Sequence, residues 1–173
     1  IKRGGFDDCD LAMMVHPGPG YTLYTAGSAM ESVKITYKGK NAHAAGAPWD
    51  GVNALNAVIQ AFNNVDAMRQ QMKPSWRVHG IITQGGLKPN IIPDECCAEW
   101  YIRALNVSDV KVLRSKVEGC FQGAALSTGC ELAMEWLADT AVDDWENGAH
   151  LYANMVSNGP MCEAFRENWA ALG

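Results

Sequence analysis

The hydrophobic pattern between Glu31 and Leu137 alternates between strand and helix periods, and this order constrains the fold most. Two segments with apolar residues three and four positions apart predict helices at 52–72 and 108–129. Four segments predict strands, three of them because apolar and polar residues alternate: 31–37, 76–83, 95–105 and 131–136. The expected order is β-α-β-β-α-β. This is the ferredoxin-like α+β pattern, an antiparallel four-stranded sheet with two helices on one face.

Short signals predict where these helices end. Asp50 is a candidate N-terminal cap for the first helix, and Pro74 stops that helix from continuing. Ser108 is the candidate cap of the second helix, and Gly129 is expected to end it. The apolar stripe of the second helix is expected to comprise Val110, Leu113, Val117, Phe121 and Ala124.

The segments on either side of this unit are apolar enough to need a partner surface. Asp10 to Val15 predicts a buried strand that ends at His16, because the sequence Pro-Gly-Pro-Gly follows. The tail from Val142 to Leu172 predicts helix, interrupted at Gly159-Pro160.

The composition excludes several classes of protein. The chain has 173 residues, enough for one domain or one and a half. Its net charge of -5 argues against a nucleic-acid groove, which needs clustered Lys and Arg. The sequence shows neither an apolar run long enough to span a membrane nor a signal peptide. Because it begins at Ile1, we expect a piece of a longer protein.

The six cysteines do not have the spacing of a structural zinc site, since no C-x-x-C pair occurs. Cys96 and Cys97 are adjacent on a predicted strand, so their side chains are expected to face opposite ways. We expect buried free thiols in a reducing compartment, the cytoplasm.

His43 is the first candidate functional residue. It lies in a strand-to-helix segment of very small residues, Gly39 to Pro48, which leaves the imidazole open and lets the backbone approach it. The alternative is a structural histidine at a strand end, hydrogen-bonded to the backbone. Local spacing alone does not decide between these interpretations.

Three further residues are candidates, each with a structural alternative. His16 ends an apolar strand pattern, where it could ligate a metal or cap the strand. Asn90 lies between two prolines in a stiffened connection, suited to recognition but also common in turns. Arg103 lies in an apolar strand, so it requires either a structural salt bridge or a ligand carboxylate.

Together these segments resemble one family, the zinc-dependent aminoacylases, carboxypeptidases and amidohydrolases of peptidase family M-twenty. The resemblance extends over nearly the whole chain and is closest to a branch of peptidase domain-containing dipeptidases. Those enzymes act on β-alanyl or similar dipeptides with a basic C-terminal residue. The motifs that carry it are Met13–His16, Gly39–Ala45, Asn90–Asp94 and Ile102–Ala104.

The resemblance implies three parts in the chain. Residues 1–29 and 139–173 are expected to belong to an α/β catalytic domain, the second as a helical return segment. Residues 30–138 are expected to form the inserted lid, through which family members form homodimers.

The resemblance also implies a role for each candidate residue. His16 is expected to ligate one of two divalent metals, which in this family are usually zinc. His43 is expected to enter the partner subunit's active site and stabilise the tetrahedral oxyanion, while Asn90 and Arg103 hold the substrate's C-terminal carboxylate. The expected substrate is a dipeptide or an N-acyl amino acid, with neither nucleic acid nor a membrane as a partner.

The remaining metal ligands and the general base of the family have no counterpart in this sequence. We therefore expect this chain alone to bind no metal pair and to hydrolyse no substrate. A second hypothesis is a non-catalytic ferredoxin-like module for dimerisation or interaction. A ferredoxin-like nucleic-acid binder is disfavoured by the charge and by the missing aromatic-basic motif.

Overall fold

The computed structural model describes residues 4–14, 17–20, 22–25, 27–136 and 152–171. The chain separates into two compact units. One comprises Ile1–Thr25 together with Ser157–Gly173, and the other comprises Ala26–Val156. The larger unit carries the candidate residues His43, Asn90 and Arg103.

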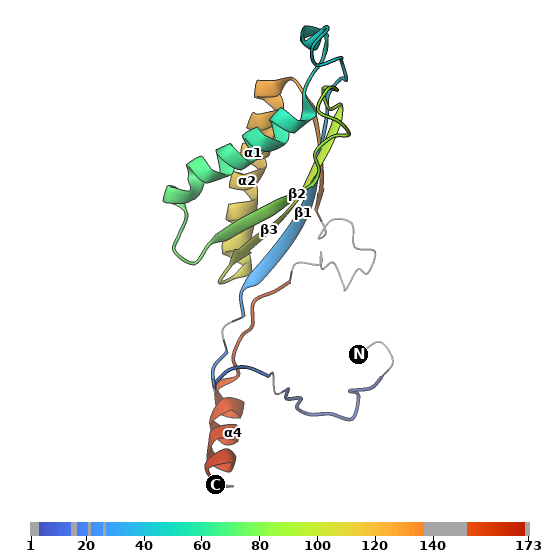
Figure 1. Cartoon of the computed structure of the whole chain (residues 1–173). Coiled ribbons are helices and arrows are strands. Elements are labelled where there is room, and N and C mark those ends of the chain that lie inside the picture. Colours follow the sequence, from blue (N-terminus) through green and yellow to red (C-terminus); the bar gives the residue numbers. More distant parts are fainter. Residues whose placement is uncertain (1–3, 15–16, 21, 26, 137–151, 172–173) are drawn as a thin grey trace. The chain divides into compact units, whose positions relative to one another are not determined.

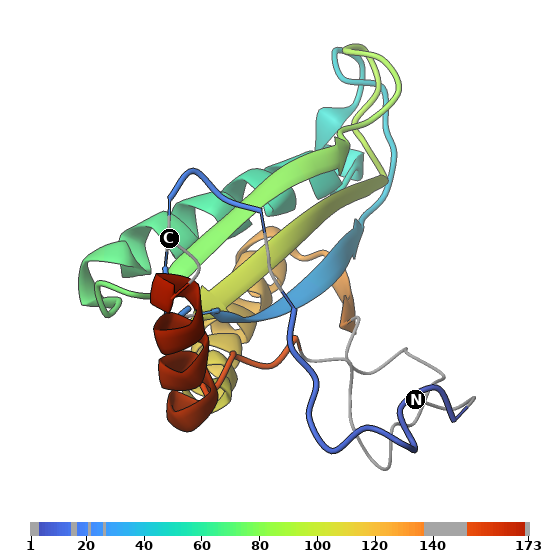
Figure 2. The ribbon, with the colours of Figure 1, turned by 90° about the horizontal axis from the view of Figure 1, so that it is seen from below.

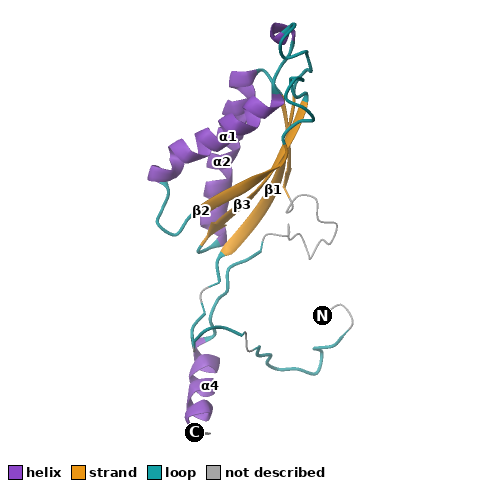
Figure 3. Cartoon of the chain, in the orientation of Figure 1, coloured by secondary structure: helices purple, strands orange, loops and turns teal. Residues whose placement is uncertain are grey.

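The larger unit is a four-stranded antiparallel sheet with two helices on one face (Figure 1). The strand order β2-β3-β1-β4 and the alternation of elements confirm the expected ferredoxin-like α+β fold. Both views place the helices on the same side of the strands (Figure 2), and Figure 3 separates the two layers by colour. The elements are β1 (Ala29–Lys38), α1 (Ala54–Met68), β2 (Arg77–Gln84), β3 (Glu95–Ala104), α2 (Val107–Thr128) and β4 (Glu131–Trp136).

The core lies between the sheet and the helices. Alternate residues of β1 point into it, and the predicted apolar stripe of α2 is buried in full. Trp100 of β3 is 1% exposed, and its ring centroid lies 4.1 Å from that of Phe62 and 5.4 Å from that of Phe121. Gly80 of β2 makes room for this indole, because a Cβ there would lie 2.4 Å from a Trp100 ring carbon.

Both helices begin at a different cap from the one expected. Asn53, not Asp50, caps α1, since its Oδ1 accepts hydrogen bonds from the backbone N–H groups of Leu55 and Asn56. Asp50 instead lies in a short 3-10 turn, Pro48–Asp50. Asn106, not Ser108, caps α2. In each case the true cap carries the amide side chain immediately before the first helical residue.

The ends of the helices agree better with expectation. Gly129 ends α2 at a φ of 72°, as expected of a left-handed terminal glycine. Helix α1 ends at Met68, and a 3-10 turn, Arg69–Gln71, continues the chain toward Pro74.

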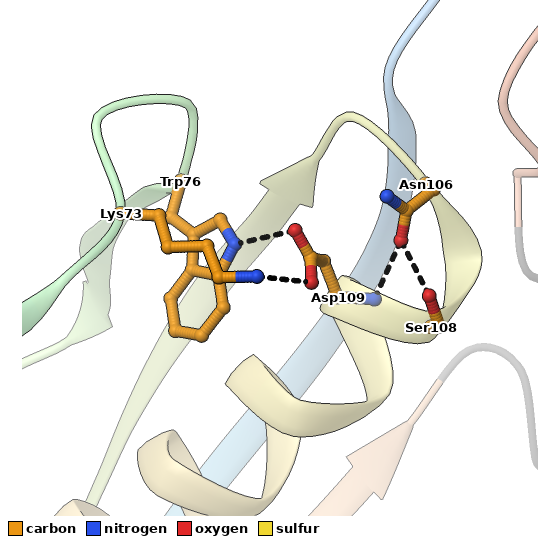
Figure 4. A network of polar contacts seen from close by, with 5 residues as sticks. All are labelled: Lys73, Trp76, Asn106, Ser108 and Asp109. Atoms are coloured by element: carbon orange, nitrogen blue, oxygen red, sulfur yellow. Dashed lines mark hydrogen bonds and ion pairs between the residues drawn. The ribbon is translucent and has the colours of Figure 1, made fainter.

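A polar network anchors the connection into β2 (Figure 4). Asp109, in the first turn of α2, accepts hydrogen bonds from the Lys73 ammonium at 2.8 Å and the Trp76 indole N–H at 3.1 Å. These hydrogen bonds, that from Lys73 above all, hold the pKa of the Asp109 carboxyl below its usual range. The network therefore fixes the start of β2 against α2.

The flanking segments depart from expectation. Asp10–Met14 form no strand and are exposed. A strand requires hydrogen-bonding neighbours, and the described residues of their unit supply none. Val15 and His16 lie outside the described residues. Gly159-Pro160 do not interrupt a helix but begin α4 (Gly159–Ala171), where proline is favoured in the first turn. Asn158 caps this helix by accepting from the Met161 N–H. Of the helix expected from 142 to 172, residues 152–158 form no helix, and residues 142–151 lie outside the described residues.

The cysteines are free as expected, but not all of them are buried. All six cysteines are free, but only Cys96, Cys97 and Cys130 are buried, while Cys9 is exposed. None of the helices in the described part of the chain is long and apolar enough to cross a membrane.

Replacing Gly80 with alanine is expected to destabilise the larger unit by about 1–3 kcal/mol, because the new Cβ would overlap the Trp100 ring. Urea denaturation of the chain, followed by tryptophan fluorescence, measures this. Gly119→Ala is the matched control, since no atom lies within 4 Å of a Cβ added there. Equal effects of the two variants would contradict the close approach of Gly80 to Trp100.

Replacing Asp109 with asparagine is expected to destabilise the chain at neutral pH. Because the folded pKa is depressed, the stabilisation by Asp109 is present above its unfolded pKa and is lost as pH falls through the folded value. The difference between wild type and Asp109→Asn should therefore shrink as the pH falls below about 4. Chemical denaturation across a pH series measures this, with Asp50→Asn as control. A difference independent of pH would contradict the network.

Candidate functional site

Two loops at one end of the sheet are joined along their backbones (Figure 1). One connects β1 to α1 and the other, residues 85–94, connects β2 to β3. The N–H of Ala44 donates to the Asn90 carbonyl at 3.0 Å, and the N–H of Ile92 donates to the Ala42 carbonyl at 2.9 Å. His43 and Ile91 form the β-bridge between these two bonds. The loops therefore form one hydrogen-bonded tip.

The first loop is also closed on itself. Lys40 and Val52 exchange two backbone hydrogen bonds, at 2.9 and 2.8 Å. Gly39 has no room for a side chain, since a Cβ would lie 2.1 Å from the Val52 carbonyl oxygen. Small residues in this segment thus permit a close fold of the backbone, and that fold positions His43.

The backbone orients the His43 imidazole. Its Nδ1 accepts hydrogen bonds from the N–H groups of Gly46 at 3.0 Å and Ala45 at 3.3 Å. An Nδ1 that accepts carries no proton, so in the neutral ring the proton is on Nε2. The His43 side chain is exposed, and Nε2–H can therefore donate to a group outside this chain. The ring is thus hydrogen-bonded to the backbone and exposed at the same time, and its catalytic role stays a prediction.

Asn90 lies beside His43 in the joined tip, as its carbonyl accepts from Ala44. Its side chain is exposed. The base of the tip is held by the N–H of Gly39, which donates to the Asp94 carbonyl at 2.7 Å, and by an Asn41–Asp94 side-chain contact at 3.4 Å. A single chain therefore presents His43 and Asn90 together.

Arg103 lies at the opposite end of the sheet. It pairs with Met30 on β1 and with Arg77 on β2, whereas the tip follows Lys38 and precedes Glu95. Glu95 and Arg103 are eight positions apart on β3, which corresponds to about 26 Å along a strand. One copy of the chain therefore cannot bring Arg103 to the same ligand as His43 and Asn90.

The surroundings of Arg103 also differ from expectation. Its strand is apolar on the helix-covered face, but Arg103 itself is exposed on the open face. No described residue forms a salt bridge with it. The structural alternative, a buried ion pair within the lid, is therefore wrong for the part of the chain that the structure describes.

The remaining histidines add no ligand cluster. His16 and His150 lie outside the described residues, so the role of His16 as a metal ligand stays a prediction. His79 lies on the open face of β2, and burial, then the charges of Arg103 and Arg69, lower its pKa. Within the described ranges, no three His, Cys, Asp or Glu side chains gather in a way that could hold a metal ion. These residues do not fit a two-metal site.

The sequence interpretation missed Arg77, which lies directly opposite Arg103. The alternation of β2 placed Arg77 and His79 on its polar face, but strand pairing was needed to bring Arg77 beside Arg103. Strand pairing was also needed to show that β2 lies at an edge of the sheet.

Comparison with known proteins decides the family. The family model described as the peptidase dimerisation domain matches residues 28–128. The chain belongs to peptidase family M-twenty. This confirms the resemblance inferred from the sequence motifs, and the matched segment covers the whole β1–α2 part of the lid.

Curated members of the family align with much or all of the chain. A Xaa-Arg dipeptidase of Mus musculus is 43% identical over the whole chain, and one of Homo sapiens is 41% identical. One of the p-aminobenzoyl-glutamate hydrolase subunits of Escherichia coli is 31% identical over 84% of the chain. The chain spans only 38%, 37% and 30% of the lengths of these three relatives.

Two solved structures share the fold. An aminobenzoyl-glutamate utilization protein from Klebsiella pneumoniae has a TM-score of 0.62 at 19% identity, covering 85% of this chain and 37% of its own. A hydantoinase/carbamoylase family amidase from Burkholderia vietnamiensis has a TM-score of 0.67 at 16% identity, covering 85% and 33%. At these identities the likeness shows the fold.

Proposed function

We propose that this chain is the lid and dimerisation portion of a metal-dependent dipeptidase or amidohydrolase. The enzyme would hydrolyse an amide bond next to a C-terminal carboxylate, in dipeptides of the β-alanyl or Xaa-basic type. The names of the relatives, Xaa-Arg dipeptidase and p-aminobenzoyl-glutamate hydrolase, support this reaction class. The single observation that carries the proposal is the exposed imidazole of His43, whose Nδ1 accepts two backbone hydrogen bonds within the tip.

Amide hydrolysis passes through a tetrahedral intermediate whose oxygen becomes negatively charged. A pre-positioned donor at that oxygen contributes about 2.7 to 4 kcal/mol of transition-state stabilisation. Two backbone N–H groups hold the His43 ring through Nδ1, so Nε2–H is directed outward before substrate binds. Asn90, next to it, would donate its side-chain amide to the substrate.

The separation of Arg103 from the tip requires a second copy of the chain. A two-fold axis perpendicular to the sheet would pair the β2 edges of two lids antiparallel and would keep both open faces on one side. The Arg77 end of one β2 then lies against the Gln84 end of the other. Arg103 of one copy thereby comes to the same end of the joint sheet as His43 and Asn90 of the second copy.

The two edges of the sheet are not equally suited to this pairing. Strand β2 exposes Ile81 and Ile82 and contains no acidic residue. Together with Ile59 and Phe62 of α1, these isoleucines line a groove beside the edge. Strand β4 exposes Glu131 and Glu135, and like charges would face each other if two copies paired there. We therefore propose β2 and α1 as the dimer surface.

The proposed active site is composite. Arg103 of one subunit and Asn90 of the other would bind the substrate carboxylate, and His43, beside Asn90, would act at the scissile carbonyl. Divalent metals would activate the attacking water, and their ligands lie outside the part of the chain that the structure describes. The free cysteines agree with a cytoplasmic location, which we propose on that ground.

Ile59→Glu is expected to convert a dimer of this chain to monomer, because a charge would enter the apolar surface beside β2. Sedimentation velocity measures the change. Leu126→Glu, which alters an exposed leucine of α2, is the matched control and should leave the dimer intact. If only Leu126→Glu dissociates the dimer, the dimer surface includes α2, and the proposed surface of β2 and α1 is wrong.

The composite site predicts complementation between two inactive variants. In the full-length enzyme, His43→Ala and Arg103→Ala are each expected to lower kcat/KM strongly. When the two variants are co-expressed, half of the dimers are mixed and one site in each mixed dimer is intact. Activity should therefore recover to about a quarter of wild type. Dipeptide hydrolysis at matched protein concentration measures this.

Two controls sharpen the complementation experiment. Lys88→Ala alters an exposed residue of the same tip and should retain activity. His43→Ala should remain dimeric by sedimentation, which separates loss of the donor from loss of assembly. If the mixture of the two variants is no more active than either variant alone, His43 and Arg103 do not act in one site across two subunits. Full activity of His43→Ala would overturn the oxyanion role of His43, and a full-length wild-type protein that hydrolyses no dipeptide would favour the non-catalytic module.

A further inference from the structure

The open face of the sheet carries cations in two different settings. Lys34 of β1 is flanked in register by Glu99 of β3 and Glu135 of β4, so an acidic residue lies on each side of it. Arg103 has a cation, Arg77, as its direct cross-strand partner on β2. Only the second arrangement places like charges opposite each other.

A like-charged pair directly across two strands is destabilising. The other neighbours of Arg103 on this face, Met30, Tyr101 and His79, supply no negative charge. Among the described residues, no carboxylate forms an ion pair with Arg77 or Arg103. Burial, then the nearby charges of Arg103 and Arg69, lowers the pKa of His79 in this corner. The arrangement is one that an external anion would stabilise.

Arg77 is held in place rather than extended freely into solvent. Its Nη1 donates to the carbonyl oxygens of Pro74 at 2.5 Å and Trp76 at 2.7 Å. Trp76 is itself buried and bound to Asp109, so the network in Figure 4 supports this arginine indirectly. A guanidinium has five N–H donors, and those on Nε and Nη2 are not used in these two bonds.

We propose that Arg77 is a second carboxylate-binding residue, which holds the substrate's C-terminal carboxylate together with Arg103. The inference rests on the proposed function, and it adds a second residue to the site for the substrate's C-terminal carboxylate. In the β2-to-β2 pairing, Arg77 lies on the edge strand, between Arg103 and the tip of the second copy. Its position is therefore closer than that of Arg103 to the proposed scissile bond.

The test compares the KM of the full-length enzyme for a dipeptide and for the same dipeptide as its C-terminal amide. Arg77→Ala should raise the KM for the free acid about ten- to a hundredfold, as expected for a lost hydrogen bond to a charged group. The kcat should change little, and the KM for the amide should stay the same, because the amide carries no charge. Arg77→Lys should restore part of the loss, and Lys34→Ala is the matched control on the same face.

The parallel variant Arg103→Ala separates failure of this inference from failure of the proposed function. If Arg103→Ala raises the KM for the acid and Arg77→Ala does not, only the role of Arg77 is overturned. If neither variant changes it, the carboxylate site itself is absent. An equal rise for acid and amide, or a monomeric Arg77→Ala in sedimentation, would overturn the inference in favour of a structural or interface role.

Discussion

The antiparallel ladder between β1 and β3 determines where every candidate residue of the lid lies. Ten residues of each strand pair in register, from Ala29 opposite Ala104 to Lys38 opposite Glu95. Because the strands run in opposite directions, the end of β1 and the start of β3 meet at one end of the sheet. The tip with His43 and Asn90 extends from that end of the sheet, and Arg103 lies at the opposite end. The length of this ladder is the physical reason why we propose a composite site.

The small residues of the tip allow a close backbone turn, and this turn orients one side chain, that of His43. Gly39 lets the Val52 carbonyl approach where a Cβ would collide, and the turn that follows donates two N–H groups to His43 Nδ1. The protein thus uses backbone donors, not side chains, to orient the ring. This leaves the imidazole accessible and selects the tautomer that can donate from Nε2.

Periodicity predicted the lid well because each of its elements buries one face. The stripe of α2 and the inward residues of β1 were recognisable because only one pattern buries them against a common core. The caps were harder to predict. Asp50 and Asn53 are both good capping residues, and the backbone bonds between Lys40 and Val52 decide where α1 can begin. The segment Asp10–Met14 was wrongly predicted as a strand because an apolar run does not show whether neighbouring strands exist to pair with it.

The sequence by itself determined the family, the order of elements and the identity of His43, Asn90 and Arg103 as candidates. Motifs and periodicity are local properties of the sequence, so they can be recognised without knowing which residues are in contact. Only the tertiary structure decided that His43 and Asn90 share one tip, that Arg103 lies about 26 Å away along the sheet, and that Arg77 stands beside it. Strand register sets these relations, because hydrogen bonds join residues that the sequence separates by dozens of positions.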